Sequence, residues 1–232
     1  MSKVMLACNA DLSKIQYPVM VSPKLDGIRA YIQGKQVYSR TGKLIPNLDI
    51  QKEFGNNPFI EGYDGELIID NNTASPATDP NVFRNTTSAV MTRNCHKSVY
   101  FYVFDRRTDD ESFVIRDKNL IEKIGLLSIA YPSEFRRIIK VHQDLVTNEK
   151  QLLELEKDYV SQGYEGIIIR NPNSKYKFGR STVNEGALLK LKRFKDSEAI
   201  VNYIYEELDQ DNNPQNTLGS LDVTDIHTGI RF

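Results

Sequence analysis

The chain has 232 residues, with 30 lysines and arginines against 31 aspartates and glutamates, and a formal net charge of −1. A hydrophobic content of 40% and a charged content of 26% are typical of a globular protein. The charge balance excludes a uniformly basic nucleic-acid coat protein but leaves room for a local basic groove. The two cysteines and three histidines are too few for a disulfide framework or for a zinc site built from those residues alone.

Targeting and membrane signals are absent from the sequence as given. No apolar run reaches the roughly 18 residues that a membrane helix needs. The first six residues contain no apolar core of the kind found in a secretory signal. These features favour a soluble protein of a reducing cytoplasm, without a membrane partner.

Short apolar stretches separated by turns dominate the chain and predict an α+β fold built on sheets. Strands rich in β-branched and aromatic residues are expected at 19–21, 28–32, 37–38, 66–70, 99–104, 166–169 and 187–192. Gln33-Gly34-Lys35 predicts a tight hairpin turn. In the last of these strands Lys190 and Lys192 alternate with Leu191, so both lysines are expected on one face.

Helices are predicted between the strands. The best candidate covers 148–162, with Thr147 or Asn148 as its N-cap and Gly163 at its end. A weaker pattern covers 116–127. The segment 71–96 is rich in Asn, Thr, Ser and Pro and is expected to be mostly loop, with a helix at 79–88.

The local charge changes sign near Lys195, which predicts a domain boundary there. Residues 165–195 contain eight basic and two acidic residues, a net charge of +6. Residues 196–232 contain eight acidic residues and one basic residue, a net charge of −7. The first block can face an anion, whereas the second would repel a phosphate backbone unless its charges point away.

The strongest chemical signal is Lys24-Leu25-Asp26-Gly27-Ile28-Arg29, which follows Ser22-Pro23. Pro23 cannot donate to a sheet ladder, so the chain is expected to leave the sheet and present Lys24 at its rim. Gly27 permits a close approach that other residues resist. Positive charge from Arg29 and desolvation would both favour the neutral, nucleophilic amine of Lys24. A surface hairpin with solvated charges is the plain alternative.

Five further segments follow in order: Ser39-Arg40-Thr41-Gly42, Asp64-Gly65-Glu66-Leu67, Tyr102-Val103-Phe104-Asp105, Glu165-Gly166-Ile167-Ile168-Ile169-Arg170 and Leu189-Lys190-Leu191-Lys192. Together with the Lys24 segment they resemble the nucleotidyltransferase motifs of ATP-dependent DNA ligases, whose wider family includes RNA ligases and mRNA capping enzymes. Each motif alone is weak, but their common order and spacing make a strong signal. The chain is most similar to the compact phage and viral ligases, because little precedes Lys24. A phage origin would imply the host cytoplasm.

The resemblance also implies a domain organisation. Residues 1–195 would form an antiparallel-sheet nucleotidyltransferase (ATP-grasp-like ligase) domain that carries out adenylation. Residues 196–232 would begin an OB-fold β-barrel, with strands at 200–205, 218–223 and 229–232. These 37 residues are fewer than a five-stranded barrel typically needs, and the family's last motif is missing from them. We therefore expect either a shortened chain or a second polypeptide that completes the barrel.

The resemblance implies that ATP is the cofactor and that Lys24 is its catalytic acceptor, which forms a phosphoramidate with AMP. Lys190 and Lys192 would stabilise charge on the transferring phosphate. Considered alone, two alternating lysines are more often a solvated strand face. Ser22 and Arg29 would bind the nucleotide, Arg29 through its ribose or phosphate.

The remaining nucleotide and metal roles implied by the resemblance fall on three motifs. Glu66 would accept hydrogen bonds from the ribose, and Phe104 would stack on the adenine, with Tyr100 and Tyr102 on the same strand face. Core packing is the alternative for all three aromatic side chains. Glu165, together with Glu66, would bind Mg²⁺ or Mn²⁺, because hard cations prefer carboxylate, water and phosphate oxygens.

On the DNA side, Arg40 would bind the 5′-phosphate at a nick, where the fork of a guanidinium fits two phosphate oxygens. Arg180, in the basic loop 175–180, would also contact that phosphate. The implied partner is nicked duplex DNA, in replication, repair or recombination.

The implied reaction passes AMP from Lys24 to the DNA 5′-phosphate and then closes the strand. Ser39-Arg40-Thr41-Gly42 and 217–221 resemble DNA ligases more than RNA ligases or GTP-using capping enzymes. A third alternative is a non-catalytic nucleic-acid-binding subunit of a split ligase.

Overall fold

The computed structural model describes residues 4–70, 81–108, 110–192, 197–209 and 211–232. The chain forms two compact units, Met1–Lys192 and Arg193–Phe232. The predicted boundary at Lys195 lies outside the described residues, as do Arg193 and Lys195 of the basic block. None of the described helices is long and apolar enough to cross a membrane.

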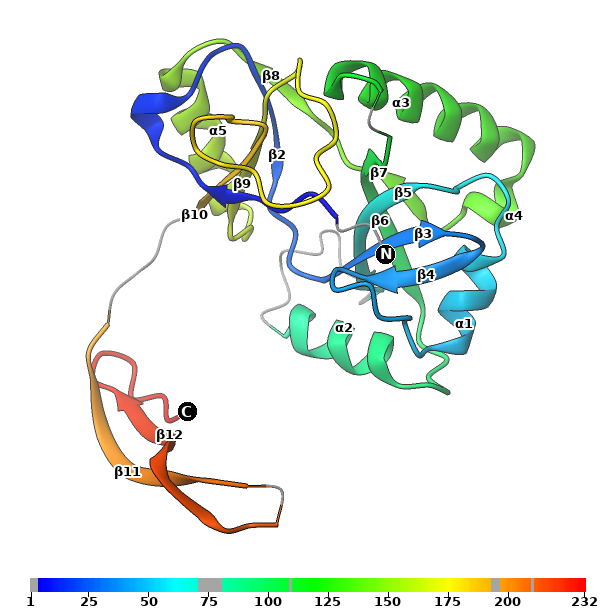
Figure 1. Cartoon of the computed structure of the whole chain (residues 1–232). Coiled ribbons are helices and arrows are strands. Elements are labelled where there is room, and N and C mark those ends of the chain that lie inside the picture. Colours follow the sequence, from blue (N-terminus) through cyan, green and yellow to red (C-terminus); the bar gives the residue numbers. More distant parts are fainter. Residues whose placement is uncertain (1–3, 71–80, 109, 193–196, 210) are drawn as a thin grey trace. The chain divides into compact units, whose positions relative to one another are not determined.

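The first sheet of the larger unit has the strand order β1-β10-β9-β2-β8. Its strands are β1 (Cys8–Asn9), β10 (Leu188–Lys192), β9 (Gly166–Arg170), β2 (Val19–Pro23) and β8 (Asp144–Val146). Helix α5 (Glu149–Ser161) lies against β2, β8 and β9 (Figure 1). Between the helix and the sheet lies an apolar core of Val19, Val21, Val146, Leu152, Ile167, Ile169 and Leu189.

The second sheet has the order β4-β3-β5-β6-β7. Its strands are β4 (Gln36–Ser39), β3 (Ile28–Gln33), β5 (Tyr63–Ile69), β6 (Val99–Arg106) and β7 (Ile138–Lys140). Along β6 the side chains of Val99, Phe101, Val103 and Asp105 are buried, whereas the alternate side chains are only partly buried. One face of this strand therefore belongs to the core, and the other is only partly covered.

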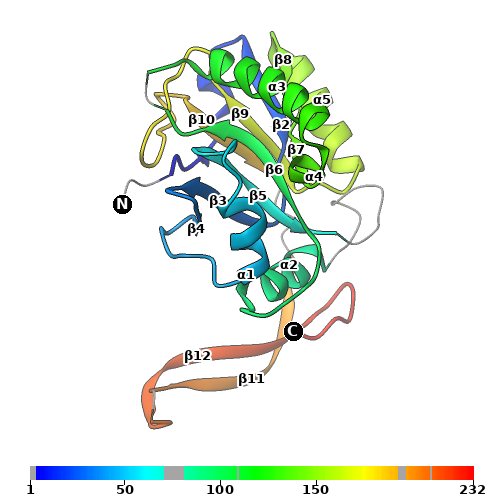
Figure 2. The same cartoon turned by 90° about the vertical axis from the view of Figure 1, so that its right-hand side faces the viewer.

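The second sheet carries most of the helices. They are α1 (Leu48–Ile50), the π-helical turn η2 (Gln51–Gly55), α2 (Val82–Met91), α3 (Phe113–Ala130) and α4 (Pro132–Phe135), and a 3₁₀ turn η1 (Leu12–Lys14) lies near the N-terminus. Helix α3 contacts β6 and β7 (Figure 2), and η2 contacts β3 and β4 at the other edge. Apolar side chains from α2, α3 and the strands form one continuous core.

Every strand predicted in residues 19–192 corresponds to an observed strand. The expected hairpin turn is present, with positive φ angles of 57° at Gly34 and 60° at Lys35. Asn148 caps α5 by accepting from the backbone N–H of Gln151 at 3.0 Å, and Gly163 follows with a φ of +96°. Helix α3 extends beyond the predicted 116–127 at both ends. Helix α2 begins and ends three residues later than predicted, and Asp79 lies outside the described residues.

The expectation of antiparallel sheets is wrong, because both sheets are mixed. The β1–β10 pair and the β6–β7 pair are parallel, and the other pairs are antiparallel. Strand β7 follows the α3 and α4 crossover, which returns the chain in its original direction, and parallel strands require such a connection. Strands β1 and β7 are edge strands of two and three residues, which is too short for their sequences to show an alternating pattern.

The smaller unit is a two-stranded antiparallel hairpin of β11 (Ala199–Leu208) and β12 (Pro214–Asp225). In its described residues no closed barrel is formed and no side chain is fully buried. The predicted strands at 200–205 and 218–223 lie within β11 and β12. The predicted strand at 229–232 is reduced to an isolated antiparallel bridge between Arg231 and Thr224, with backbone hydrogen bonds that join Ile230 to Asp225 and Phe232 to Val223 of β12. The side chain of Asp225 accepts from the N–H groups of His227 and Thr228 and bends the chain into a turn.

Candidate active site

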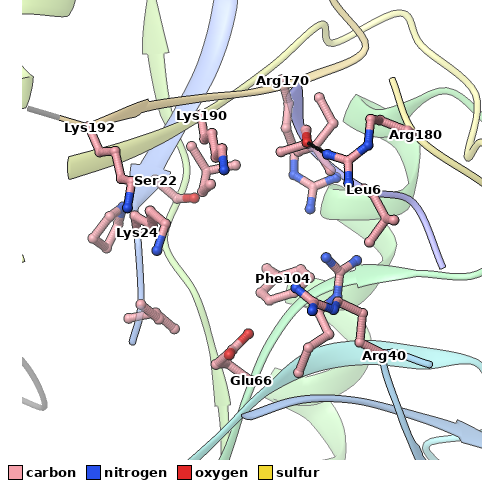
Figure 3. Close-up of a pocket in the computed structure, with 16 residues that line it drawn as sticks. Leu6, Ser22, Lys24, Arg40, Glu66, Phe104, Arg170, Arg180, Lys190 and Lys192 are labelled. Carbon is pink, nitrogen blue, oxygen red and sulfur yellow. Dashed lines mark hydrogen bonds between the residues drawn. The ribbon is translucent and has the colours of Figure 1, made fainter. Parts of the chain in front are cut away.

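A cavity of about 320 Å³ in the larger unit is lined by residues from both sheets (Figure 3). Ser22, Ile168 and Lys190 come from the first sheet. Arg29, Glu66 and Phe104 come from the second sheet. The other lining residues are Leu6, Ala7, Pro23, Lys24, Leu25, Arg40, Arg170, Arg180, Leu188 and Lys192.

Most of the predicted site residues meet at this cavity although they are far apart in the sequence. Those that line it are Ser22, Lys24, Arg29, Arg40, Glu66, Phe104, Arg180, Lys190 and Lys192. Glu165 is not a lining residue, but its carboxylate contacts Lys24. In Figure 3 the three lysines lie at one end, whereas Arg40 and Arg180 lie at the other.

The register of the first sheet determines which of its side chains face the cavity. Lys190 pairs with Ile168, which also pairs with Ser22 on the other side. Lys192 pairs with Gly166, whose carbonyl accepts from the backbone N–H of Lys24 at 2.9 Å. Leu191 points the other way and packs against the apolar core. The prediction that both lysines share one face is confirmed.

Two glycines allow the backbones around Lys24 to approach closely. A Cβ added to Gly166 would lie 2.2 Å from the carbonyl oxygen of Leu191, and the φ of Gly166 is +149°. A Cβ added to Gly27 would lie 2.4 Å from the carbonyl oxygen of Leu67. The close approach expected at Gly27 is therefore made by strand β5 of the same chain.

At the lysine end, Glu165 lies between two cations. Its carboxylate accepts from the Nζ of Lys24 and, at 3.2 Å, from the Nζ of Lys192. Partial burial works to raise the pKa of Glu165, but the hydrogen bonds and charges of Lys24 and Lys192 outweigh it and the pKa is lowered. Glu165 is therefore an ionised carboxylate that holds the amines of two cavity-lining lysines.

Arg29 lines the same cavity as Lys24, but its positive charge is balanced by a carboxylate. Its guanidinium forms a bidentate pair with the buried carboxylate of Asp64, at 2.8 and 2.7 Å. The hydroxyl of Tyr176 also donates to Asp64, at 2.6 Å. Although burial works against the charged form, Asp64 raises the pKa of Arg29. The pairing fixes the orientation of Arg29 at the cavity wall.

Glu66 pairs with Arg29 across β3 and β5, and its carboxylate faces the cavity (Figure 3). Burial raises the pKa of Glu66 to about 7, against the opposing effect of Arg29 and Lys24. The carboxyl group therefore changes protonation state near neutral pH. Only its ionised form is a full acceptor for neighbouring hydroxyl groups.

Phe104 lies on the partly buried face of β6 and lines the cavity. The guanidinium carbon of Arg29 lies 4.8 Å from the centroid of its ring, and that of Arg170 lies 5.4 Å away. Tyr100 and Tyr102 share this face, as predicted. Their rings lie edge to face, with the ring centroids 6.3 Å apart. Neither tyrosine lines the cavity.

Sequence reasoning assigned no role to Arg170, Asp105 or the N-terminal segment. Arg170 lines the cavity, and its Nη1 donates to Asp105 at 2.7 Å. The sequence does contain one signal for Arg170, because this cationic residue ends the Glu165–Arg170 motif directly after an apolar run. Leu6 and Ala7 also line the cavity, and the carbonyl of Ala7 accepts from Arg180 at 2.8 Å. No sequence signal marks these two residues.

Comparison with known proteins gives consistent matches. Residues 2–192 match the family model described as an ATP dependent DNA ligase domain. A DNA ligase of Haemophilus influenzae is 30% identical over 186 residues, covering 78% of this chain and 60% of that protein. A DNA ligase of African swine fever virus is 29% identical over 192 residues, covering 78% of this chain and 43% of that protein. The match thus spans about half the length of these curated relatives.

Among solved structures, the crystal structure of Chlorella virus DNA ligase-adenylate is similar over the whole chain. The two share 33% sequence identity with a TM-score of 0.70. The similarity covers 100% of this chain and 83% of the viral protein.

Proposed function

This chain belongs to the family of ATP-dependent DNA ligase domains, and on that premise we propose that it seals nicks in duplex DNA through AMP carried on Lys24. The observation that best supports this proposal is the charge of the cavity. Among the residues that the structure describes, seven lining side chains are cationic, from Lys24, Arg29, Arg40, Arg170, Arg180, Lys190 and Lys192, and Glu66 is the one lining carboxylate. Such a site suits a polyanionic substrate such as ATP.

In the proposed first step the Nζ of Lys24 attacks the α-phosphorus of ATP. A nitrogen–phosphorus bond forms, the bond to the pyrophosphate oxygen breaks and pyrophosphate leaves, and the amine gives up a proton to the solvent. Glu165 orients the amine before the reaction, and the incoming phosphates compete with Glu165 for Lys24 and Lys192. Lys190 and Lys192 share one strand face beside the nucleophile and stabilise charge on the transferring phosphate.

The nucleoside of ATP is proposed to extend away from the lysines along the cavity. Phe104 offers a ring face for the adenine, and base stacking of this kind contributes about 1–3 kcal/mol. Glu66 accepts hydrogen bonds from the ribose when it is ionised. Ser22 contributes a hydroxyl group from the end of β2, and Arg29 is held beside Phe104 by Asp64.

A Mg²⁺ or Mn²⁺ ion fits the lysine end only together with phosphate oxygens. The described residues contain no group of three histidine, cysteine or acidic side chains that could hold a metal alone. Magnesium is commonly bound through one or two carboxylates together with substrate phosphates. Glu165 is the suitable carboxylate, while Glu66, with its pKa of about 7, is a weaker second ligand. The bound ion would neutralise phosphate charge.

For the second and third steps we propose that Arg40 and Arg180 bind the 5′-phosphate of a nicked duplex. Both line the cavity, and Arg180 is held by the carbonyl of Ala7. An oxygen of that 5′-phosphate would attack the phosphorus of AMP, which breaks the nitrogen–phosphorus bond and returns the protonated amine of Lys24. The 3′-hydroxyl would then lose its proton, attack the phosphorus of the 5′-phosphate, displace AMP and close the strand. Contacts of this kind read backbone shape and carry no base sequence.

The domain assignment is part of the same proposal. Residues 1–195 act as the adenylation domain, and 196–232 form the first part of an OB-fold barrel. The hairpin of β11 and β12 supports this, because strand edges and exposed apolar side chains such as Ile204 and Leu218 can accept further strands. Those strands can come from the same polypeptide or from a second one.

Covalent labelling tests the proposed first step. The whole chain is incubated with Mg²⁺ and either ATP or GTP, and intact mass identifies the adduct. An AMP adduct that is lost in Lys24→Ala supports the proposal. The matched control is Lys177→Ala, since Lys177 pairs with Glu185 at 2.6 Å and does not line the cavity. A GMP adduct would indicate a capping-type enzyme instead.

The acceptor is tested with a nicked duplex that already carries a 5′-adenylate. Sealing of this DNA supports the final step without requiring ATP. Sealing of a matched nicked RNA at a higher rate would contradict DNA as the substrate. A chain that neither forms an adduct nor seals the adenylated nick would contradict catalysis and favour a binding subunit.

A further inference from the structure

Strand β9 contributes to one wall of the cavity through every second residue, including Ile168 and Arg170. Gly166 pairs with Lys192, Ile168 with Lys190, and Arg170 with Leu188. Two residues of a strand span about 7 Å, so Arg170 lies about 13 Å along β9 from Gly166, whose carbonyl accepts from the backbone N–H of Lys24. A nucleoside whose phosphate is at Lys24 therefore extends toward Arg170, past the apolar side chain of Ile168.

Arg170 has unused hydrogen-bond donors although it is buried. Its side chain is only 3% exposed, and its Nη1 donates to Asp105 at 2.7 Å. Its Nε is buried with no hydrogen-bond partner among the described residues. Buried polar groups are normally paired, so an unpaired buried donor at a cavity wall calls for an acceptor that a ligand can supply. In Figure 3 the guanidinium of Arg170 points into the cavity toward Phe104.

Arg116 shows what a purely structural guanidinium looks like in the same cluster. It donates to both oxygens of Asp105, at 2.7 and 3.2 Å, and to the carbonyls of Glu111 and Ser174, at 2.6 and 3.2 Å. It does not line the cavity. One carboxylate thus anchors two guanidiniums, of which only Arg170 faces the cavity.

The surroundings of Arg170 suit a base better than a phosphate. The ring of Phe104 lies 5.4 Å from its guanidinium carbon, and the neighbouring wall is formed by Ile168 and Leu188. A flat ring fits between such apolar surfaces, and adenine offers acceptors at N1, N3 and N7. We propose that Arg170 donates a hydrogen bond to one ring nitrogen of the adenine and, anchored by Asp105, determines how the base is oriented. This inference rests on the proposed function.

The test replaces each acceptor atom of the base in turn. The rate of adduct formation on Lys24 is measured against the concentration of ATP, 1-deaza-ATP, 3-deaza-ATP and 7-deaza-ATP. One analogue should need about tenfold more nucleotide for half-saturation, as expected for a hydrogen bond from a charged donor. The other two analogues should behave like ATP.

Variants then assign that sensitivity to a side chain. Arg170→Met should need about tenfold more ATP and should no longer distinguish ATP from the sensitive analogue. Arg116→Met is the matched control, because it also removes a guanidinium from Asp105 but leaves the cavity wall unchanged. It should retain the discrimination of the original chain. If circular dichroism shows that Arg170→Met does not fold, the deaza-ATP measurements on the original chain and on Arg170→Lys are used to decide whether Arg170 contacts the base.

Failure of this inference and failure of the proposed function give different results. If the original chain forms no adduct with ATP, both are overturned. If it forms the adduct but reaches half-saturation at the same concentration with all three deaza analogues as with ATP, only the inference is overturned. Discrimination that persists in Arg170→Met would likewise assign base recognition to another residue and overturn the inference.

Discussion

The two ends of the cavity hold their charges in different ways. At the lysine end the side chains of Lys24 and Lys192 are 21% and 25% exposed and share Glu165, which is 39% exposed. The arginine end, by contrast, is Arg170 in the cavity wall together with Asp105, which it contacts, and Arg116, which also contacts Asp105; Asp105 and Arg116 are fully buried and Arg170 is 3% exposed. The first arrangement can be reorganised by an incoming anion, whereas the second holds the cavity wall in place.

This difference follows from desolvation. An exposed ion pair contributes about 0–1 kcal/mol to stability, because water screens its charges. Removing one partner of a buried pair costs about 3–5 kcal/mol, because the other charge is left uncompensated in a poor solvent. Substitutions at the lysine end should therefore change the rate of adduct formation more than stability. Substitutions at the arginine end should reduce stability more than they change the rate of adduct formation.

The largest expected effect is on chemistry, from Lys24→Ala. Without the amine, no nucleotide adduct should form at any ATP concentration. The free energy of unfolding should stay within about 1 kcal/mol of the original value, because the lost contact is an exposed pair. Intact mass after incubation with ATP and a urea unfolding curve measure the two quantities. A large loss of stability would show that Lys24 is part of the structural framework.

The next largest effect is expected from Asp105→Asn, which keeps the shape of the side chain and removes its charge. Asp105 accepts from Arg116 at 2.7 and 3.2 Å and from Arg170 at 2.7 Å. Two buried guanidiniums would lose their counter-charge, and unfolding should become easier by about 3–5 kcal/mol. Urea unfolding followed by circular dichroism measures the change. If the free energy of unfolding falls by less than about 1 kcal/mol, the expected difference in stability effects between the two ends would be contradicted.

A smaller effect should appear as a pH dependence at Glu66. Burial raises its pKa to about 7, so the folded chain binds its proton more tightly than the unfolded chain does. Stability should therefore fall as pH rises from 4.5 to about 7, where the buried carboxyl becomes charged. Relative to Glu66→Gln, the original chain should lose about 1–3 kcal/mol across this range. Parallel pH-dependent profiles for the two proteins would contradict the raised pKa.

Nucleotide binding should have the opposite pH dependence if Glu66 accepts from the ribose. Affinity for ATP should increase as pH rises through about 7, because only the ionised carboxylate accepts from both hydroxyl groups. Glu66→Gln should flatten this profile. Calorimetric titration with ATP at several pH values separates this effect from the change in stability.

The smallest effect on stability is expected from Glu165→Gln. Its contacts with Lys24 and Lys192 are partly exposed, so the free energy of unfolding should change by about 1 kcal/mol or less. The same change should slow adduct formation, because the two amines lose the carboxylate that orients them. A destabilisation as large as that of Asp105→Asn would show that the two ends do not differ.

Much of the candidate site could be predicted from the sequence, because its residues lie in short motifs at strand ends. The alternation of Lys190 and Lys192 about Leu191 determines their common face. The capping of α5 by Asn148 is similarly local. Such features depend on neighbouring residues and on the strand period of two, so they are visible without a tertiary structure.

Other features depend on contacts between distant segments, and only the tertiary structure decided them. Asp64 and Asp105 lie side by side on β5 and β6. They reach across to Tyr176 and Arg170, and these partners are far away in the sequence. The pairing of Arg29 with Asp64, in place of a free charge beside Lys24, has the same origin.

The sequence by itself thus determined the longer strands, the motif residues and the common face of Lys190 and Lys192, because these follow from local periodicity. The tertiary structure decided which charges are buried together. It also decided that the edge strands β1 and β7 are parallel, and that residues 229–232 turn back on β12 instead of adding a strand. The physical reason is that burial and strand register are properties of packed surfaces, and no local pattern specifies the partner across the interface.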